Sequence, residues 1–131
     1  MIVQSFYSHL SGASGVLAIT SSIYPHHLPQ HANKPAITYG MAGDDDEQLV
    51  DGDISSLKTA LFDVDCWDYS YLDAHGLADA VETALVGHTG DLGSLSPADQ
   101  VDHIRKERRF DLFESDTKLY RVSLQFLVAY F

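Results

Sequence analysis

Three histidines lie close together in a proline-rich stretch of the chain: His26, His27 and His31. Three imidazoles could bind Zn²⁺, with a carboxylate as the fourth ligand. Metal ligands must be held by rigid elements, however, and the prolines between residues 25 and 35 exclude a regular helix or a central strand here. We therefore interpret the three as solvated loop histidines and expect neither a metal nor a cofactor. A small metal-binding module that uses them is the alternative.

A second cluster consists of carboxylates between residues 44 and 53. Its members are Asp44, Asp45, Asp46, Glu47, Asp51 and Asp53. Such a run suggests Ca²⁺, but an EF-hand loop needs glycine at its sixth position. The sixth residue is Leu49 when counted from Asp44, and Ser56 when counted from Asp51. Because like charges this close cannot pack together, the run predicts a solvated acidic loop.

No nucleophile with a neighbouring base stands out. Cys66, the only cysteine, falls on the apolar side of an alternating segment, which is typical of a small buried residue. Asp63, Asp65 and Asp68 could supply a pair of carboxylates, but acidic residues at alternate positions of a strand more often indicate a solvent-exposed face. The chain contains no P-loop, no Gly-x-Ser-x-Gly and no Gly-x-Gly-x-x-Gly motif. We therefore predict that the protein is not an enzyme.

Four basic residues lie in the middle of a segment that otherwise has the composition of a strand, residues 101–114. They are Arg105, Lys106, Arg108 and Arg109. Simple alternation predicts that Arg105 and Arg109 share one face with Glu107, and that the other two share the opposite face. Two interpretations are open. The charges could keep an edge strand from aggregating, or they could dock an acidic partner, including the acidic surface of a second copy.

The balance of charge limits the class of partner. The chain has 131 residues, and its 8 Lys and Arg against 19 Asp and Glu give a formal net charge of −11. Residues 1–99 carry 2 basic and 14 acidic residues, whereas residues 100–131 carry 6 and 5. A protein that grips nucleic acid needs a basic surface, so this composition argues against that class. The length predicts a single domain over residues 1–131.

The sequence also indicates in which cellular compartment the protein is made. A single cysteine excludes an intrachain disulfide, and no apolar run approaches the ~20 residues that cross a bilayer. The first residues lack the pattern of a signal peptide. We therefore expect a protein made in a reducing cytoplasm, with no membrane partner.

Periodicity predicts two helices and four strands. The helices fall at residues 2–10 and 70–86, and the strands at 36–41, 57–67, 101–114 and 119–131. The order α-β-β-α-β-β predicts an α+β fold: a four-stranded antiparallel sheet with helices packed on one face. The last strand would be roughly 40 Å long, about twice the usual length, which is typical either of a strand that contacts a neighbouring chain or of a bent or bulged strand.

Several short motifs, taken in order along the chain, resemble one known family. They lie at residues 23–25, 35–39, 64–67, 77–81, 111–114 and 119–126. In this order and spacing the chain resembles the small tail-completion, or tail terminator, proteins of long-tailed bacteriophages, prophages and gene transfer agents. The resemblance spans about residues 5–131.

The resemblance implies a structural protein of the virion, assembled in the host bacterial cytoplasm. Such proteins form a ring, typically a hexamer, on the end of the tail tube, where the ring stops tube growth and offers a surface to the head connector. DNA passes through the ring. The implied partners are further copies of the chain, the tail tube protein and a head-completion or connector protein. The alternative within the virion is another neck component, such as a stopper or an adaptor.

Two charged segments are the candidate contact surfaces under this resemblance. We expect the basic run at 105–109 to contact another subunit or the tail tube. The acidic residues at 44–47, with Asp51 and Asp53, would form a loop that faces the lumen or contacts a partner. An acidic channel would let DNA slide because carboxylates repel phosphates.

Overall fold

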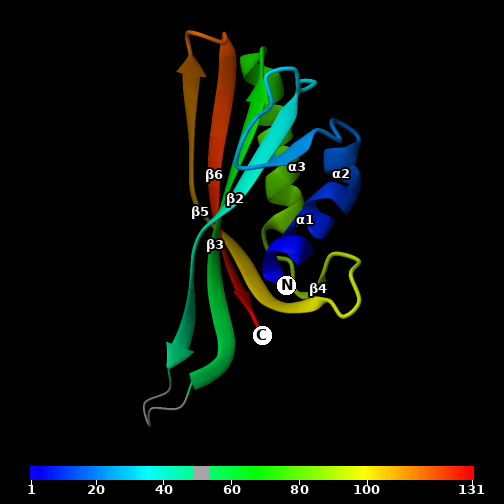
Figure 1. Cartoon of the computed structure of the whole chain (residues 1–131), viewed down its shortest axis with the longest axis vertical. Coiled ribbons are helices and arrows are strands. Elements are labelled where there is room, and N and C mark those ends of the chain that lie inside the picture. Colours follow the sequence, from blue (N-terminus) through cyan, green and yellow to red (C-terminus); the bar gives the residue numbers. More distant parts are fainter. Residues whose placement is uncertain (49–53) are drawn as a thin grey trace.

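One sheet of six strands forms the body of the protein, in the spatial order β1-β2-β3-β6-β5-β4 (Figure 1). The computed structural model describes the backbone of residues 1–48 and 54–131 and the side chains of residues 1–44 and 57–131. The strands are β1 Ile23–Pro25, β2 Ala36–Gln48, β3 Ile54–Asp68, β4 Gly90–Leu92, β5 Asp99–Glu114 and β6 Leu119–Tyr130. The helices are α1 Ile2–Gly12, α2 Ser14–Leu17 and α3 Tyr71–Leu85.

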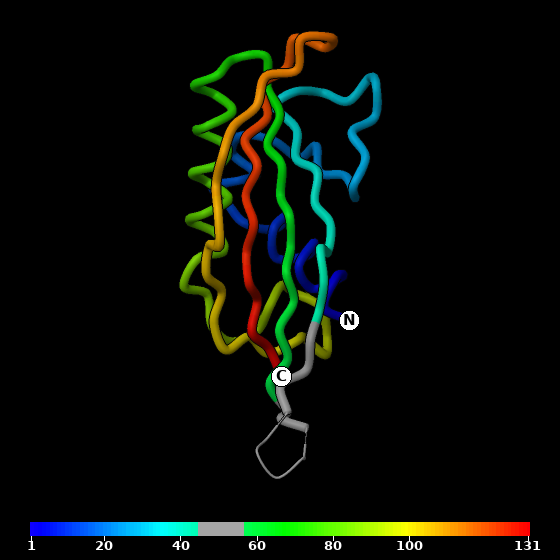
Figure 2. The backbone as a smooth tube through the Cα atoms, turned by 90° about the vertical axis from the view of Figure 1, so that its left-hand side faces the viewer, coloured from blue at the N-terminus to red at the C-terminus, as the bar shows by residue number. Residues whose placement is uncertain are grey.

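The sheet is mixed. β1 runs parallel to β2, while β2–β3, β3–β6, β6–β5 and β5–β4 are antiparallel. β3, β5 and β6 run along most of the length of the molecule (Figure 2), and the sheet twists strongly along them (Figure 1). The long twist is the expected consequence of extended pairs of right-handed strands.

The predicted architecture is therefore wrong. In place of a four-stranded antiparallel sheet with helices on one face, the described residues form a curled, mixed, six-stranded sheet with three helices, and strands dominate it. Two strands of three residues each, β1 and β4, are too short to leave a periodic signal. β1 lies within the proline-rich stretch, where Ile23 and Pro25 pair in parallel with Ile37 and Tyr39.

The predicted acidic loop is also wrong for residues 44–47. The backbone there continues β2, with Asp44 opposite Ala60, Asp45 opposite Thr59 and Asp46 opposite Lys58. Main-chain pairing with β3 outweighs the poor strand propensity of Asp, because propensity differences amount to at most about 1 kcal/mol per residue. Asp51 and Asp53 lie outside the described residues.

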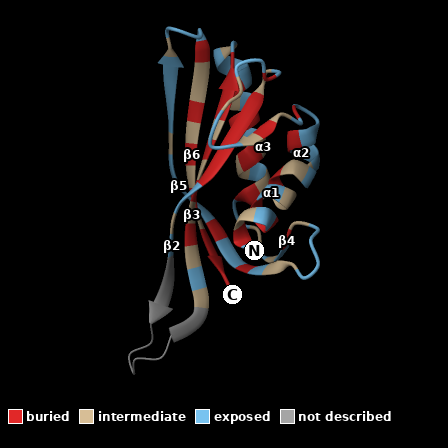
Figure 3. Ribbon diagram, in the orientation of Figure 1, coloured by how far each residue is buried: buried red, intermediate tan, exposed pale blue. Residues whose placement is uncertain are grey.

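The core lies between the helices and one face of the sheet, which we call the helix face (Figure 3). β3 contributes Ala60, Phe62, Val64 and Cys66, all at most 1% exposed, as the alternation predicts. The opposite face, which none of the described helices covers, is called the open face. Residues on β5 and β6 are assigned to the two faces by their pairing with β3, because directly opposed residues share a face.

Helix α3 follows the local signals of the sequence. The Ser70 hydroxyl accepts a hydrogen bond from the Asp73 amide at 3.3 Å, which satisfies one of the free N–H groups of the first turn. Leu77, Val81 and Leu85 are fully buried on the side that meets the sheet. Gly87, just beyond the helix, has a φ of 82°, a conformation in which glycine is favoured.

The contact between α1 and the sheet is the basis of the first prediction. The Phe6 and Phe62 rings are stacked with centroids 4.0 Å apart, and both side chains are fully buried. We expect Phe6→Ala to lower the free energy of unfolding by about 3–5 kcal/mol through the cavity it leaves, as measured by urea denaturation. Leu72→Ala, at a site 77% exposed, is the control and should cost less than about 0.5 kcal/mol. Equal stabilities of the two variants would contradict the described packing.

Candidate functional site

The basic run lies on β5, next to an edge of the sheet. β6 pairs with one side of β5, and on the other side β4 pairs only with Asp99–Val101 among the described strands. The register between β5 and β6 shifts between Lys106 and Arg108, so that Glu107 is an extra residue, as in a β-bulge. The basic residues therefore lie beside a largely unpaired strand edge.

The bulge changes which basic residues share a face. Lys106 lies opposite Phe126 and Arg109 opposite Leu124, both of which are buried on the helix face. Arg105 and Arg108 lie opposite Leu127 and Gln125 on the open face. The alternation predicted from the sequence is wrong here, because one extra residue inverts the sides that follow it.

The two basic residues on the helix face are already bound to α3. Arg109 donates to Asp79 at 2.8 Å and also to Glu82, and Lys106 Nζ lies 2.9 Å from Glu82. Arg109 Nη2 further donates to His75 Nδ1 at 2.7 Å. Partial burial raises the pKa of Glu82, but the hydrogen bonds from Lys106 and Arg109 outweigh it, so that this pKa lies below its ordinary value.

The two basic residues on the open face remain exposed. Arg105 Nε donates to its neighbour Glu107 at 2.7 Å. Arg108 lies over the ring of Phe110, with 5.3 Å between the guanidinium carbon and the ring centroid. Among the described side chains, no carboxylate lies within ion-pair distance of Arg108. Arg105 and Arg108 are thus the members of the run whose position suits contact with another molecule.

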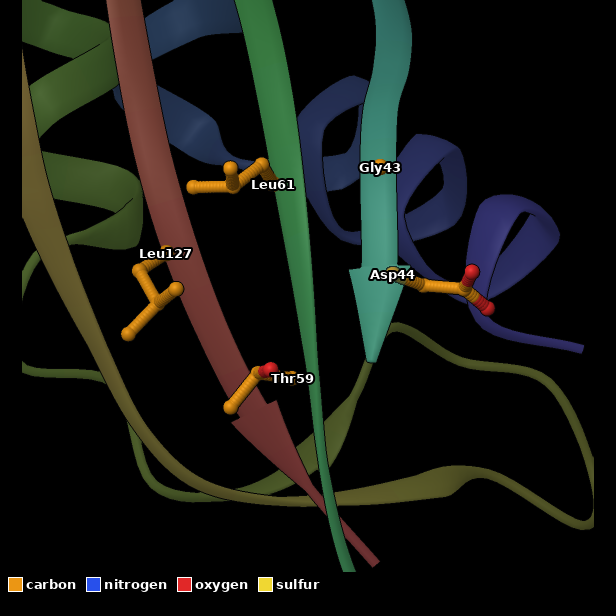
Figure 4. A pocket seen from close by; sticks show the side chains of 5 residues that line it. All are labelled: Gly43, Asp44, Thr59, Leu61 and Leu127. Atoms are coloured by element: carbon orange, nitrogen blue, oxygen red, sulfur yellow. The ribbon is translucent and has the colours of Figure 1, made fainter. Parts of the chain in front are cut away.

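The acidic run lies at the opposite side of the sheet. Two strands, β3 and β6, separate β2 from β5, so the protein does not bring its acidic and basic runs together. On the outer side of β2, β1 pairs only as far as Tyr39. Asp44 is exposed and lines a pocket of about 330 Å³ with Gly43, Thr59 and the apolar pair Leu61 and Leu127 (Figure 4).

The histidines of the proline-rich stretch do not converge. His26 has a φ of 54° and packs its ring against β2, where a Cβ at Gly40 would overlap with it. His27 lines a neighbouring pocket, and His31 is exposed. Among the described residues, no three His, Cys, Asp or Glu side chains gather closely enough to hold a metal ion.

A polar cluster on the open face was not predicted from the sequence as a site. Its pocket, of about 320 Å³, is lined in part by His26, Asp65, Trp67 and Arg121. The Arg121 guanidinium lies over the Trp67 ring at 5.3 Å. Desolvation by burial raises the pKa of Asp65, although a hydrogen bond from Ser123 and the charge of Arg121 oppose the rise. In the sequence, the only indication of a polar face here was that Asp63 and Asp65 occupy alternate positions of a predicted strand.

Cys66 lies on the helix face and is fully buried. Burial raises the pKa of its thiol, so the thiolate needed for nucleophilic attack does not form at neutral pH.

Comparison with known proteins gives first the fold and then the family. The chain has the fold of a virion component: it matches a chain of the structure titled "Virion of native gene transfer agent (GTA) particle" with a TM-score of 0.64 and 18% identity, over 95% of this chain and 90% of the other. The sequence model of the family described as tail completion protein gp17 matches residues 4–130. The chain therefore belongs to the tail completion protein gp17 family, and it is a structural protein of a phage-type tail.

These comparisons confirm the resemblance drawn from the order of motifs. A search of curated proteins finds no match. Among the described residues, no helix is long and apolar enough to cross a membrane.

The ion pairs on α3 predict different roles for two neighbouring arginines. Arg109→Ala removes contacts to Asp79, Glu82 and His75, and we expect it to lower the free energy of unfolding by about 1–2 kcal/mol at pH 7. Because the pKa of Glu82 is held low, this contribution is present above about pH 4.5 and is lost as the pH falls below it. Arg108→Ala is the matched control and should cost less than about 0.5 kcal/mol. Urea titrations at several pH values compare the two, and equal losses would contradict the assignment.

The environment of Asp65 predicts the opposite dependence on pH. A carboxyl whose pKa is raised by folding destabilises the protein when it is ionised, so Asp65→Asn should raise the free energy of unfolding at pH 7 by about 1 kcal/mol. The gain should vanish near pH 3, where Asp65 is protonated in both states. Asp63 accepts a hydrogen bond from Gln125 at 3.0 Å. Asp63→Asn is therefore the control and should not raise the free energy of unfolding. A stabilisation that persists at pH 3 would contradict this account.

Proposed function

We propose that the protein forms a ring, of six copies, at the head-proximal end of a tail tube. The ring ends tube growth, offers the surface to which the head joins, and lets DNA pass through its centre. The observation that carries the proposal is the family match over residues 4–130, which covers nearly the whole chain. Its partners would be further copies of itself, the tail tube protein and a head-completion or connector protein.

The size of the chain supports assembly of several copies. A domain of 131 residues has a radius of gyration of roughly 14 Å, too small to surround duplex DNA. A channel therefore needs several copies joined by heterologous contacts that close on themselves. Two strand edges at opposite sides of one sheet, each covered by a described strand over only three residues, suit such head-to-tail contacts.

The charge of the protein supports passage of DNA rather than its retention. With a net charge of −11, a ring of several copies would repel phosphates over most of its surface. A ring that bound DNA through many basic contacts would slow its movement, because each phosphate contact adds to the affinity. The acidic residues from Asp44 onward are proposed to lie toward the lumen or toward a partner.

The role proposed is structural and not enzymatic. Cys66 is buried, and in the polar cluster on the open face the Arg121 guanidinium lies over the Trp67 ring, with no nucleophile beside a base among the described residues. A mostly helical neck adaptor fits the six-stranded sheet less well than a tail terminator does.

Removal of the protein tests the proposal directly. In host cells that lack it, we expect tails of irregular, extended length and heads without attached tails, both counted in negative-stain micrographs. Expression of the wild-type chain in trans should restore uniform tails joined to heads. Tails of normal length with heads attached, in the absence of the protein, would overturn the proposed function.

A further inference from the structure

The sheet has two long stretches of uncovered edge. On β5, pairing with β4 ends at Val101, and the Ile104 carbonyl accepts from the Gly87 amide at 3.0 Å; from Arg105 to Glu114 no described strand covers the outer side. On β2, pairing with β1 ends at Tyr39, and the backbone from Gly40 to Gln48 has no described strand on its outer side. At ~3.3 Å per residue, each stretch is about 30 Å long.

The two edges carry opposite charges. The β5 edge contains four basic residues between positions 105 and 109, and the β2 edge contains four acidic residues at positions 44–47. Arg105 and Arg108 are exposed on the open face of β5, and Asp44 is exposed on β2. Uncovered main-chain groups with complementary charge are what pairing between strands of two molecules requires.

We propose that the outer edge of β5 in one copy pairs with the outer edge of β2 in the next copy, so that the sheets join into one continuous sheet around the ring. The occupant of each edge is thus a second copy of this chain. The inference rests on the proposed ring and names the contact that closes it.

The direction of pairing follows from the topology. β2, β3, β6 and β5 alternate in direction, so β2 and β5 of one copy are antiparallel. A rotation about an axis along the strands keeps these directions, so β5 of one copy meets β2 of the next in antiparallel orientation. Such pairing can be repeated from copy to copy until it closes, as a heterologous contact must.

The charges also suggest a register. An antiparallel alignment that places Asp44 opposite Arg109 places Asp45 opposite Arg108 and Gly43 opposite Phe110. This alignment is consistent with the faces of the sheet: Asp44 and Arg109 occupy helix-face positions, since they pair with Ala60 and Leu124.

Gly43 and Phe110 likewise share the open face in this register, since they pair with Leu61 and Ser123. Phe110 is 40% exposed in the single copy, and a neighbouring strand would cover it.

Charge reversal and its rescue test the attraction. We expect Arg108→Glu to lower the yield of rings about tenfold, counted by negative-stain microscopy of purified protein or of tail ends. Asp45→Lys, at the position opposite Arg108 in this register, should do the same, and the two substitutions together should restore rings. Lys118→Glu and Asp116→Arg, in the exposed turn after β5, are matched controls and should leave the yield unchanged. Rings that tolerate either reversal, or a double variant without rescue, would overturn the proposal.

A disulfide tests the geometry. Gly43→Cys has open space for the new side chain, and Phe110→Cys lies in the proposed opposing position. In rings that carry both, mild oxidation should give a ladder of covalently linked copies on a non-reducing gel, whereas the buried Cys66 stays free. The pair Gly43→Cys with Asp116→Cys is the control and should give no ladder.

The outcomes separate the two proposals. Rings that form but give no ladder and ignore both charge reversals would overturn the β5–β2 contact and leave the proposed function standing. Absence of rings in the wild-type protein, both in solution and on tails, would overturn both.

Discussion

The main-chain hydrogen bonds at the edges of the sheet are the constraint on which the rest of the structure depends. Each edge strand leaves every second N–H and C=O group without a partner in its own sheet, and such groups attract other strands. β1 and β4 cover only three residues of their neighbours each. The bulge at Glu107 and the charges beside it are features of β5 that discourage indiscriminate pairing, and the proposed β5–β2 contact would admit a partner that matches this edge in charge and direction.

The helices explain why this open sheet is stable as one molecule. Phe6 of α1 and the Leu77–Leu85 stripe of α3 bury one face of the sheet, so the strands need no second sheet to form a core. Arg109 ties α3 to β5 through Asp79 and Glu82, which fixes the strand whose outer edge is uncovered. The side chains that tie β5 to α3 therefore belong to the helix face.

Local signals in the sequence predicted some elements well. The Ser70 cap and apolar stripe predicted α3, and the alternation from Ala60 to Cys66 predicted the buried side of β3, because these patterns arise from neighbours along the chain. The extent of β2 could not be predicted in this way, since its acidic residues are held extended by pairing with β3. The environment of Asp65 could not be predicted from the sequence either, because Arg121 and Ser123 belong to a strand far along the chain.

The charge pattern acquires a more specific meaning from these contacts. The local excess of basic residues near the C-terminus is not a free positive surface, because Lys106 and Arg109 are neutralised by α3. Of the other two members of the run, Arg105 is paired with Glu107, and Arg108 has no carboxylate within ion-pair distance among the described side chains. At physiological ionic strength the Debye length is about 8 Å, so these two arginines cannot select a partner from a distance. They can favour one register over another once strands are within hydrogen-bonding distance, where main-chain groups supply the affinity and the charges supply the choice of partner.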